Sequence, residues 1–180
     1  MTRFHTTAPY GVTEASMGAP SISFADLAGR QRPAILRYLT RLLGDENEAQ
    51  DVCQDAFFRA HRAFVRLGRD ANTRAWLYKI ATNCALNAAR RRTRQDARRI
   101  DVDLDALPAS TGPSPERREQ LRAVAGAVRG LPPKQRAALM LRQFDGFGYA
   151  EIAASLGGSE AAARANVYQA MKKLRAALRR

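Results

Sequence analysis

Apolar residues recur at spacings of three and four along most of the chain, which is the period of an amphipathic α-helix. The clearest stripe lies in residues 45–64 and comprises Ala49, Val52, Cys53, Ala56, Phe57, Ala60 and Phe64. Together with capping residues, this period predicts helices over 24–43, 45–64, 76–92, 116–129, 131–144, 149–157 and 159–180. No segment shows the alternation of a β-strand. The chain is therefore predicted to be all-α.

Several helix ends carry residues with a clear local role. Ser23, Asp45 and Ser159 are side chains that cap helix N-termini by accepting from backbone amides. Pro33 has no amide hydrogen, and its ring crowds the carbonyl of residue 29. We therefore expect a break or a kink at Pro33 within the first helix.

The helical period is lost between residues 93 and 116. This stretch, which includes "DVDLDALPASTGPSPE", combines acids with Pro, Gly and Ser, a composition typical of linkers. The predicted organisation is a flexible tail (1–20), a first helical module (21–93), a flexible linker (94–117) and a second helical module (118–180).

Charge is distributed unevenly over these modules. The chain has 180 residues, with 30 Lys and Arg against 17 Asp and Glu, a net charge of +13. Residues 51–93 carry nine basic and three acidic groups, and residues 121–180 carry eleven and three, whereas residues 94–120 are close to neutral. Two basic blocks favour two modules that each meet a polyanion. A basic surface that serves only solubility is the alternative.

The helix predicted over residues 76–92 has an unusual polar side. It contains no acidic residue and ends in three arginines. At 100° per residue, Lys79, Asn83, Asn87 and Arg90 fall within about 80° of arc. Leu77, Ile80, Ala81, Cys84 and Ala88 occupy another side and should face the core. The helix before it carries the opposite charge, with Glu48, Asp51 and Asp55 on its polar side.

Other kinds of site have little support. Cys53 and Cys84 both lie on apolar stripes and are interpreted as small buried hydrophobes, with a redox pair as the alternative. The two histidines form no cluster with them, so neither a metal site nor a cofactor is predicted. No apolar run approaches the length of a transmembrane helix, and the N-terminus does not resemble a secretory signal. We expect a cytoplasmic protein.

Residues 149–174, "YAEIAASLGGSEAAARANVYQAMKKL", have the layout of a helix-turn-helix. The first helix should bury Ile152, Ala153 and Leu156, and the second Ala162, Val167, Ala170, Met171 and Leu174. The outer side of the second helix offers Arg164, Asn166, Tyr168, Gln169, Lys172 and Lys173. Arg, Asn and Gln can pair with base edges, and Lys and Arg with phosphates. A helix pair from a bundle with a solvated basic side is the alternative.

Both modules resemble one family. The segments "LLGDENEAQDVCQDAFFRAHRAF" and "TRAWLYKIATNCALNAARRR" are similar to region 2 of bacterial sigma factors, and "LPPKQRAALMLRQFDGFGYAEIAASLGGSEAAARANVYQAMKKLRAAL" is similar to region 4. With a short linker between them, the chain resembles the extracytoplasmic-function (ECF) subgroup of the sigma-70 family. The resemblance implies a transcription factor without catalytic residues that gives core RNA polymerase promoter recognition and melting.

Roles for the first module follow from this resemblance. In the family, the acidic helix of region 2 docks on the clamp helices of the polymerase beta-prime subunit, which here implicates Ala49, Asp51, Gln54 and Asp55. The promoter-melting helix matches residues 76–92. By resemblance, Asn83 captures an extruded base of the minus-ten element, and Lys79, Asn87, Arg90 and Arg91 hold the adjacent strand. Trp76 is expected to pack into the core of region 2, with base stacking as the alternative.

In the second module, the resemblance assigns recognition of the minus-35 element to Arg164, Ala165, Asn166, Tyr168, Gln169, Lys172 and Lys173. The run "AAARANVYQAM" departs from the family's usual "GTVKSRLHRAR", and three commonly basic positions are Asn166, Gln169 and Met171. The minus-35 sequence is therefore left open. Expected partners are core polymerase, including its beta subunit, promoter DNA and an anti-sigma factor.

Two other functions remain possible from the residues. A free-standing helix-turn-helix regulator would bind duplex DNA without polymerase, although the acidic stripe at Asp51 and Asp55 argues against it. An enzyme acting on DNA would need a carboxylate triad or an activated Ser or Tyr nucleophile, and no such cluster is found beside a basic face.

Overall fold

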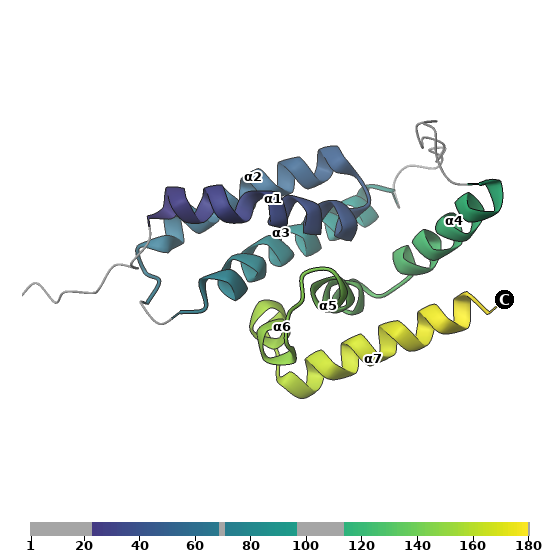
Figure 1. Ribbon diagram of the computed structural model, residues 1–180. Coiled ribbons are helices and arrows are strands. Elements are labelled where there is room, and N and C mark those ends of the chain that lie inside the picture. Colours follow the sequence, from purple (N-terminus) through teal and green to yellow (C-terminus); the bar gives the residue numbers. More distant parts are fainter. Residues whose placement is uncertain (1–22, 69–70, 97–113, 180) are drawn as a thin grey trace, which may run out of the picture.

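The computed structural model describes residues 23–68, 71–96 and 114–179, and these form seven helices and no strand. The helices are α1 (Phe24–Leu43), α2 (Glu46–Phe64), α3 (Thr73–Asp96), α4 (Pro115–Arg129), α5 (Pro133–Gln143), α6 (Tyr149–Leu156) and α7 (Glu160–Ala177). Figure 1 shows α1, α2 and α3 lying along one another, with α5, α6 and α7 grouped beside α3. The all-α prediction is confirmed. The predicted tail over 1–20 and most of the predicted linker fall outside the described residues.

Capping residues start the helices of the first half as predicted. The Ser23 hydroxyl accepts from the Asp26 amide at 3.1 Å, and the Asp45 carboxylate accepts from the Glu48 amide at 2.8 Å. Asn72 plays the same part for α3, because its side-chain oxygen accepts from the Ala75 amide at 2.9 Å. Gly44 ends α1 at φ 80°, a left-handed conformation that glycine adopts without strain.

Of the break or kink predicted at Pro33, the break is wrong, and a kink stays a prediction. Helix α1 runs without interruption from Phe24 to Leu43 and contains Pro33. Proline removes one hydrogen bond, the one that would end on the Gly29 carbonyl. Both Pro33 and Gly29 are exposed, so water can satisfy that carbonyl. The buried face of α1, which includes Leu27 before Pro33 and Ile35 and Tyr38 after it, holds the helix together across this position.

The core of α1–α3 contains the stripes predicted for it. On α2, Ala49, Val52, Cys53, Ala56 and Ala60 are buried, with Phe57 packed at the edge. On α3, Leu77, Ala81, Cys84 and Ala88 are buried and Ile80 is partly buried. Trp76 packs against the same core, and its ring centroid lies 6.3 Å from that of Phe64.

Helix α3 also buries a second face that the apolar pattern did not predict. This face comprises Ala75, Tyr78, Thr82 and Ala85. The buried Tyr38 and Thr82 hydroxyls form a hydrogen bond of 2.8 Å between α1 and α3. Helix α6 covers part of the face, since the Ser155 hydroxyl donates to the Ala75 carbonyl at 3.3 Å. Buried residues of both halves therefore belong to one continuous core.

Helices α6 and α7 form the predicted helix-turn-helix, joined through Gly157 at φ 66°. Ile152, Ala153, Val167 and Ala170 are buried, as predicted. Ala162 is exposed and Ala163 is buried instead, which corrects the prediction for α7. Ala163 lies four residues before Val167 and seven before Ala170, so it continues their face of the helix.

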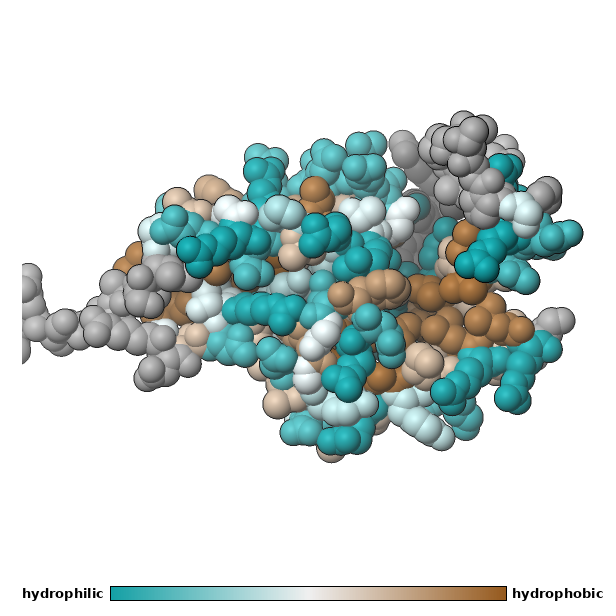
Figure 2. All heavy atoms as spheres, in the orientation of Figure 1, coloured by the Kyte–Doolittle hydropathy of each residue, from teal (hydrophilic) through white to brown (hydrophobic). Residues whose placement is uncertain are grey.

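Helix α4 packs along α7 with much of its apolar side uncovered. Leu121 is 54% exposed, Val124 39% and Leu178 48%. Figure 2 shows apolar side chains gathered between α4 and α7. In the part of the chain that the structure describes, no helix is long and apolar enough to span a bilayer.

Candidate nucleic-acid interface

The polar stripe predicted on α3 lies on the surface. Lys79, Asn83, Asn87, Arg90 and Arg91 are all exposed. No acid occurs between Thr73 and Gln95, so nothing within this part of the helix would repel a phosphate backbone. Amides can pair with base edges and cations can follow phosphates, which suits this surface to a nucleic-acid strand.

The orientation of this stripe is fixed by the two buried faces of α3. Leu77 and Ala81 lie in the core, and the Tyr38–Thr82 hydrogen bond restrains the helix against rotation about its axis. Taking 100° per residue, Asn83 lies about 100° from Thr82 on the helical wheel. The packing of α3 therefore keeps the amides of Asn83 and Asn87 on the solvent side.

An acidic surface occupies the outer side of the neighbouring helix α2. Asp51 and Gln54 are exposed, and the side chain of Asp55 is 41% exposed. Ala49 has no exposed surface, so it packs beneath this face and cannot itself touch a partner. These polar side chains line a shallow depression together with Phe58, which is 62% exposed.

Asp55 connects this acidic surface to α3. The Arg59 guanidinium donates to the Asp55 carboxylate at 2.9 Å, and this bond holds the pKa of Asp55 below its usual range. The Cys84 thiol lies against the same carboxylate. Burial, with a smaller contribution from Asp55, raises the pKa of Cys84 to about 11. Cys84 is thus a protonated thiol at neutral pH, and Cys53 and Cys84 are both buried and free.

Most of the predicted contact residues on α7 are exposed. They are Arg164, Ala165, Tyr168, Gln169, Lys172 and Lys173, whereas Asn166 is half-buried. Arg164 already has two partners. Its guanidinium donates to Glu160 at 2.8 Å and lies 4.4 Å from the ring centroid of Tyr149, the first residue of α6.

No arrangement for catalysis by a metal is found in the described residues. None of their His, Cys, Asp and Glu side chains forms a group of three or more that could hold a metal ion. The chemistry available on the two exposed helix faces is hydrogen bonding, charge pairing and stacking.

Comparison with known families places each half of the structure. The family described as sigma-70 region 2 matches residues 27–95, and sigma-70 region 4 matches residues 121–174. The chain is 34% identical over 154 residues to the RNA polymerase sigma-H factor of Pseudomonas aeruginosa, covering 80% of each chain. This chain is an ECF sigma factor of the sigma-70 family.

Further relatives agree with this assignment. The sigma factor is 31% identical over 173 residues to the ECF RNA polymerase sigma factor SigE of Mycolicibacterium smegmatis, covering 94% of this chain and 66% of that protein. Its structure matches that of the sigma factor RpoE from Bartonella quintana, solved with the anti-sigma factor NepR. That match has a TM-score of 0.69 and 26% sequence identity, and it covers 87% of this chain and 96% of the other.

Within the sigma factor, region 2 comprises α1–α3, and region 4 comprises the C-terminal part of α4, α5 and the helix-turn-helix. Sequence reasoning missed Phe58 and Tyr149. Phe58 follows Asp51, Gln54 and Asp55 at helical spacing, and that position was a usable signal. Tyr149 stacks with Arg142 and Arg164, a contact across two helix junctions that no local pattern indicates.

Proposed function

We propose that this sigma factor directs core RNA polymerase to specific promoters and helps to melt them. The observation that carries the proposal is the division of charge within region 2. Helix α3 exposes a polar stripe without acids, while the adjacent helix α2 exposes Asp51, Gln54 and Asp55. An acidic face would repel DNA, so a protein that bound only DNA would gain nothing from it.

Each face then has its own partner. The α2 face binds the clamp helices of the beta-prime subunit, with Phe58 adding an exposed aromatic anchor next to the acids. On α3, Asn83 captures one unstacked base of the minus-ten element, because its amide can both donate and accept. Lys79, Asn87, Arg90 and Arg91 hold the strand on either side by pairing with its phosphates.

Region 4 binds the minus-35 element as duplex through the exposed side of α7. Arg164, Tyr168 and Gln169 project from the part of α7 that lies after the turn, where recognition helices enter the major groove. Lys172 and Lys173 lie one turn further and pair with phosphates. The apolar face between α4 and α7 is the surface that we assign to the polymerase beta subunit, since exposed apolar patches mark protein contacts.

The sigma factor has no catalytic residues in this proposal, and it acts in the cytoplasm, where polymerase and promoters are. An anti-sigma factor is a further expected partner, because similar sigma factors have been solved with one, as in the RpoE–NepR complex.

Run-off transcription with purified core polymerase tests the proposal. Core polymerase alone should give no discrete product, and addition of the sigma factor should give defined transcript starts on a subset of promoter fragments. A gel-shift assay with and without core polymerase separates this function from a free-standing regulator. Tight, sequence-specific binding to duplex DNA without polymerase, combined with no transcription in its presence, would favour the regulator.

A further inference from the structure

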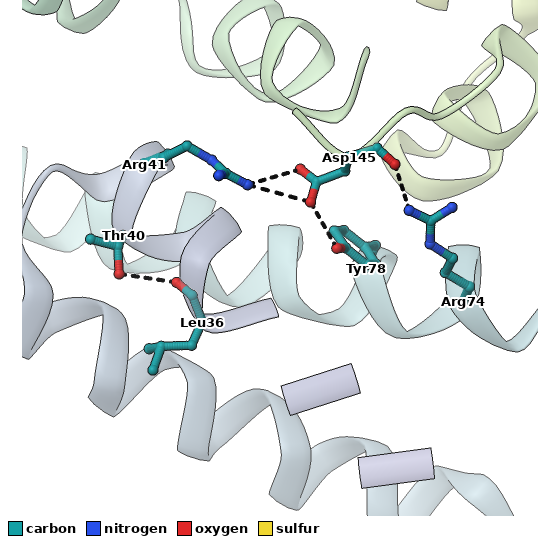
Figure 3. Close-up of polar contacts among 6 residues, drawn as sticks. All are labelled: Leu36, Thr40, Arg41, Arg74, Tyr78 and Asp145. Atoms are coloured by element: carbon teal, nitrogen blue, oxygen red, sulfur yellow. Dashed lines mark hydrogen bonds and ion pairs between the residues drawn. The ribbon is translucent and has the colours of Figure 1, made fainter. Parts of the chain in front are cut away.

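Region 2 and region 4 are joined by a cluster of contacts around the turn between α5 and α6. Asp145 lies in this turn, and its side chain is only 6% exposed. Its carboxylate faces region 2 (Figure 3). The Tyr78 hydroxyl of α3 donates to it at 3.0 Å, and the Arg41 guanidinium of α1 lies 3.4 Å from both of its oxygens.

Two arginines of region 2 also hold the residues around Asp145. Arg74 donates to the backbone carbonyl of Asp145, and its guanidinium lies 4.1 Å from the ring centroid of Phe147. Arg41 lies 4.7 Å from the ring centroid of Phe144. The turn therefore presents a carboxylate flanked by two phenylalanine rings. Region 2 contacts it with two arginines, each stacked on one of these rings, and with the hydroxyl of Tyr78.

Asp145 serves this contact and not the fold of region 4. The described partners of its carboxylate, Arg41 and Tyr78, both belong to region 2. Region 4 holds its own turn by other bonds, from the Phe147 amide to the Leu141 carbonyl and from Arg142 to the Phe147 carbonyl.

Burial of the Asp145 carboxylate is costly unless its charge is paired. Burial raises the pKa of Asp145, and the hydrogen bond from Tyr78 and the charges of Arg41 and Arg74 oppose that rise. A buried charge persists only when it is paired, so the acid and its partners depend on one another.

We propose that the Phe144–Phe147 turn is an intramolecular ligand of region 2, and that Asp145 is the anchor that keeps the free sigma factor closed. In the closed form, region 4 occupies the side of α3 around Tyr78, next to the polar stripe of Lys79 and Asn83. Any partner that requires the two regions apart must first displace this turn.

Promoter binding is such a case, and this step rests on the proposed function. The names of the two promoter elements place them about 25 base pairs apart, which is about 85 Å along B-form DNA. A compact chain of this length has a radius of gyration of about 16 Å and measures about 40 Å across. The closed molecule cannot bind both elements at once. The closed fraction therefore lowers the apparent affinity for polymerase and promoter.

Small-angle X-ray scattering of the full chain, without polymerase, tests the anchor. We expect Asp145→Ala and Arg41→Ala each to raise the ratio of open to closed molecules about tenfold or more, and so to increase the radius of gyration. This change in the open-to-closed ratio is smaller than the change expected for a fully buried ion pair, because the Arg41 side chain is 30% exposed and its contact with Asp145 is long. Glu119→Ala, which removes an exposed carboxylate from α4, is the matched control and should change nothing.

A charge exchange guards against simple misfolding. Asp145→Arg should open the molecule, because the introduced guanidinium would be repelled by Arg41 and Arg74. Adding Arg41→Asp should restore an ion pair and with it a compact molecule. Circular dichroism should show the same helix content in all variants. A wild-type chain that is already extended, unchanged scattering of Asp145→Ala, or an exchange that restores nothing would overturn the anchor.

The consequence for function has its own readout. The opened variants should form the polymerase–promoter complex at severalfold lower sigma concentration than wild type. Variants with a larger radius of gyration that still need the wild-type sigma concentration to form this complex would overturn the proposed competition between closure and promoter binding. If wild type itself gives no transcription with core polymerase, the proposed function fails while the scattering result stands independently.

Discussion

The polar residues of α3 differ in what they can contribute to DNA binding, and this difference can be measured. Asn83→Ala removes an amide that pairs with a base edge, so it should relax preference at one minus-ten position, at a cost of about 1–3 kcal/mol for the preferred base. Arg90→Ala with Arg91→Ala removes charge, so it should weaken all promoters alike and flatten the salt dependence of binding. Transcription from promoters varied one base at a time provides the measurement.

A pre-opened promoter supplies the control for Asn83. If its amide captures an unstacked base, the loss should persist when melting is no longer required. Unchanged rate and unchanged base preference in Asn83→Ala would show that this helix face has another partner.

Arg164 is the second test at this scale. Its bond to Glu160 is exposed and worth little, so the side chain can leave it for DNA. Arg164→Ala should cost about 1–3 kcal/mol of promoter binding, and only on promoters with the preferred minus-35 base. Equal losses on scrambled DNA would make Arg164 a phosphate contact. Because Arg164 also stacks on Tyr149, the thermal stability of the Arg164→Ala variant should be compared with that of Arg175→Ala, which removes an exposed arginine near the end of α7.

Single positions were predictable from sequence where one periodic stripe decides them. The burial of Val52 and Leu77 follows from spacing alone. Tyr78 and Thr82 could not be found this way, because a helix buried on two sides leaves no simple period and both residues are polar enough to look solvent-facing. Their burial depends on α1 and region 4, which lie far away in the sequence.

Helices α1 and α2 show what capping and propensity decide at the level of the element. The helix starts at Ser23 and Asp45 were set by local chemistry and were predicted. The continuity of α1 through Pro33 was not, because its buried face outweighs one missing hydrogen bond on the solvent side. Tertiary packing thus overrides a local breaker when the lost bond remains accessible to water.

The acidic face of α2 should behave as a separable element. Asp51→Arg with Asp55→Arg should lower the affinity for core polymerase by at least about 2 kcal/mol, or thirtyfold, through charge reversal at the contact. Asp51→Arg alone is the cleaner variant, since Asp55 also pairs with Arg59. Co-purification and titration with core polymerase measure the effect.

The matched control makes the same charge change elsewhere on α2. Glu46→Arg alters an exposed carboxylate that lies about 140° from Asp51 around the helix, and it should leave polymerase affinity close to wild type. Undiminished binding of the Asp51→Arg variant would contradict the assignment of this face.

At the scale of the whole molecule, the sequence predicted two helical modules but not their contact. Asp145 contacts Arg41, which is 104 positions away in the sequence, and Tyr78, which is 67 positions away. Nothing in local pattern or composition pairs residues at such separations. The segment "FDGFG" lies where one predicted helix ends and the next begins, and its role depends on the surface that receives it.

The shared core of the two regions makes a prediction about stability. Ile152 of α6 is fully buried, and α6 packs on α3. Ile152→Ala should lower the free energy of unfolding by about 2–5 kcal/mol through the cavity it leaves. Because the core is continuous, native-state hydrogen exchange should become faster in α3 as well as in α6 and α7. Val65→Ala, at a position 82% exposed, should change stability by less than about 0.5 kcal/mol. Faster exchange confined to α5–α7 would mean that region 4 unfolds without disturbing region 2, and that the two regions are thermodynamically independent in the free sigma factor.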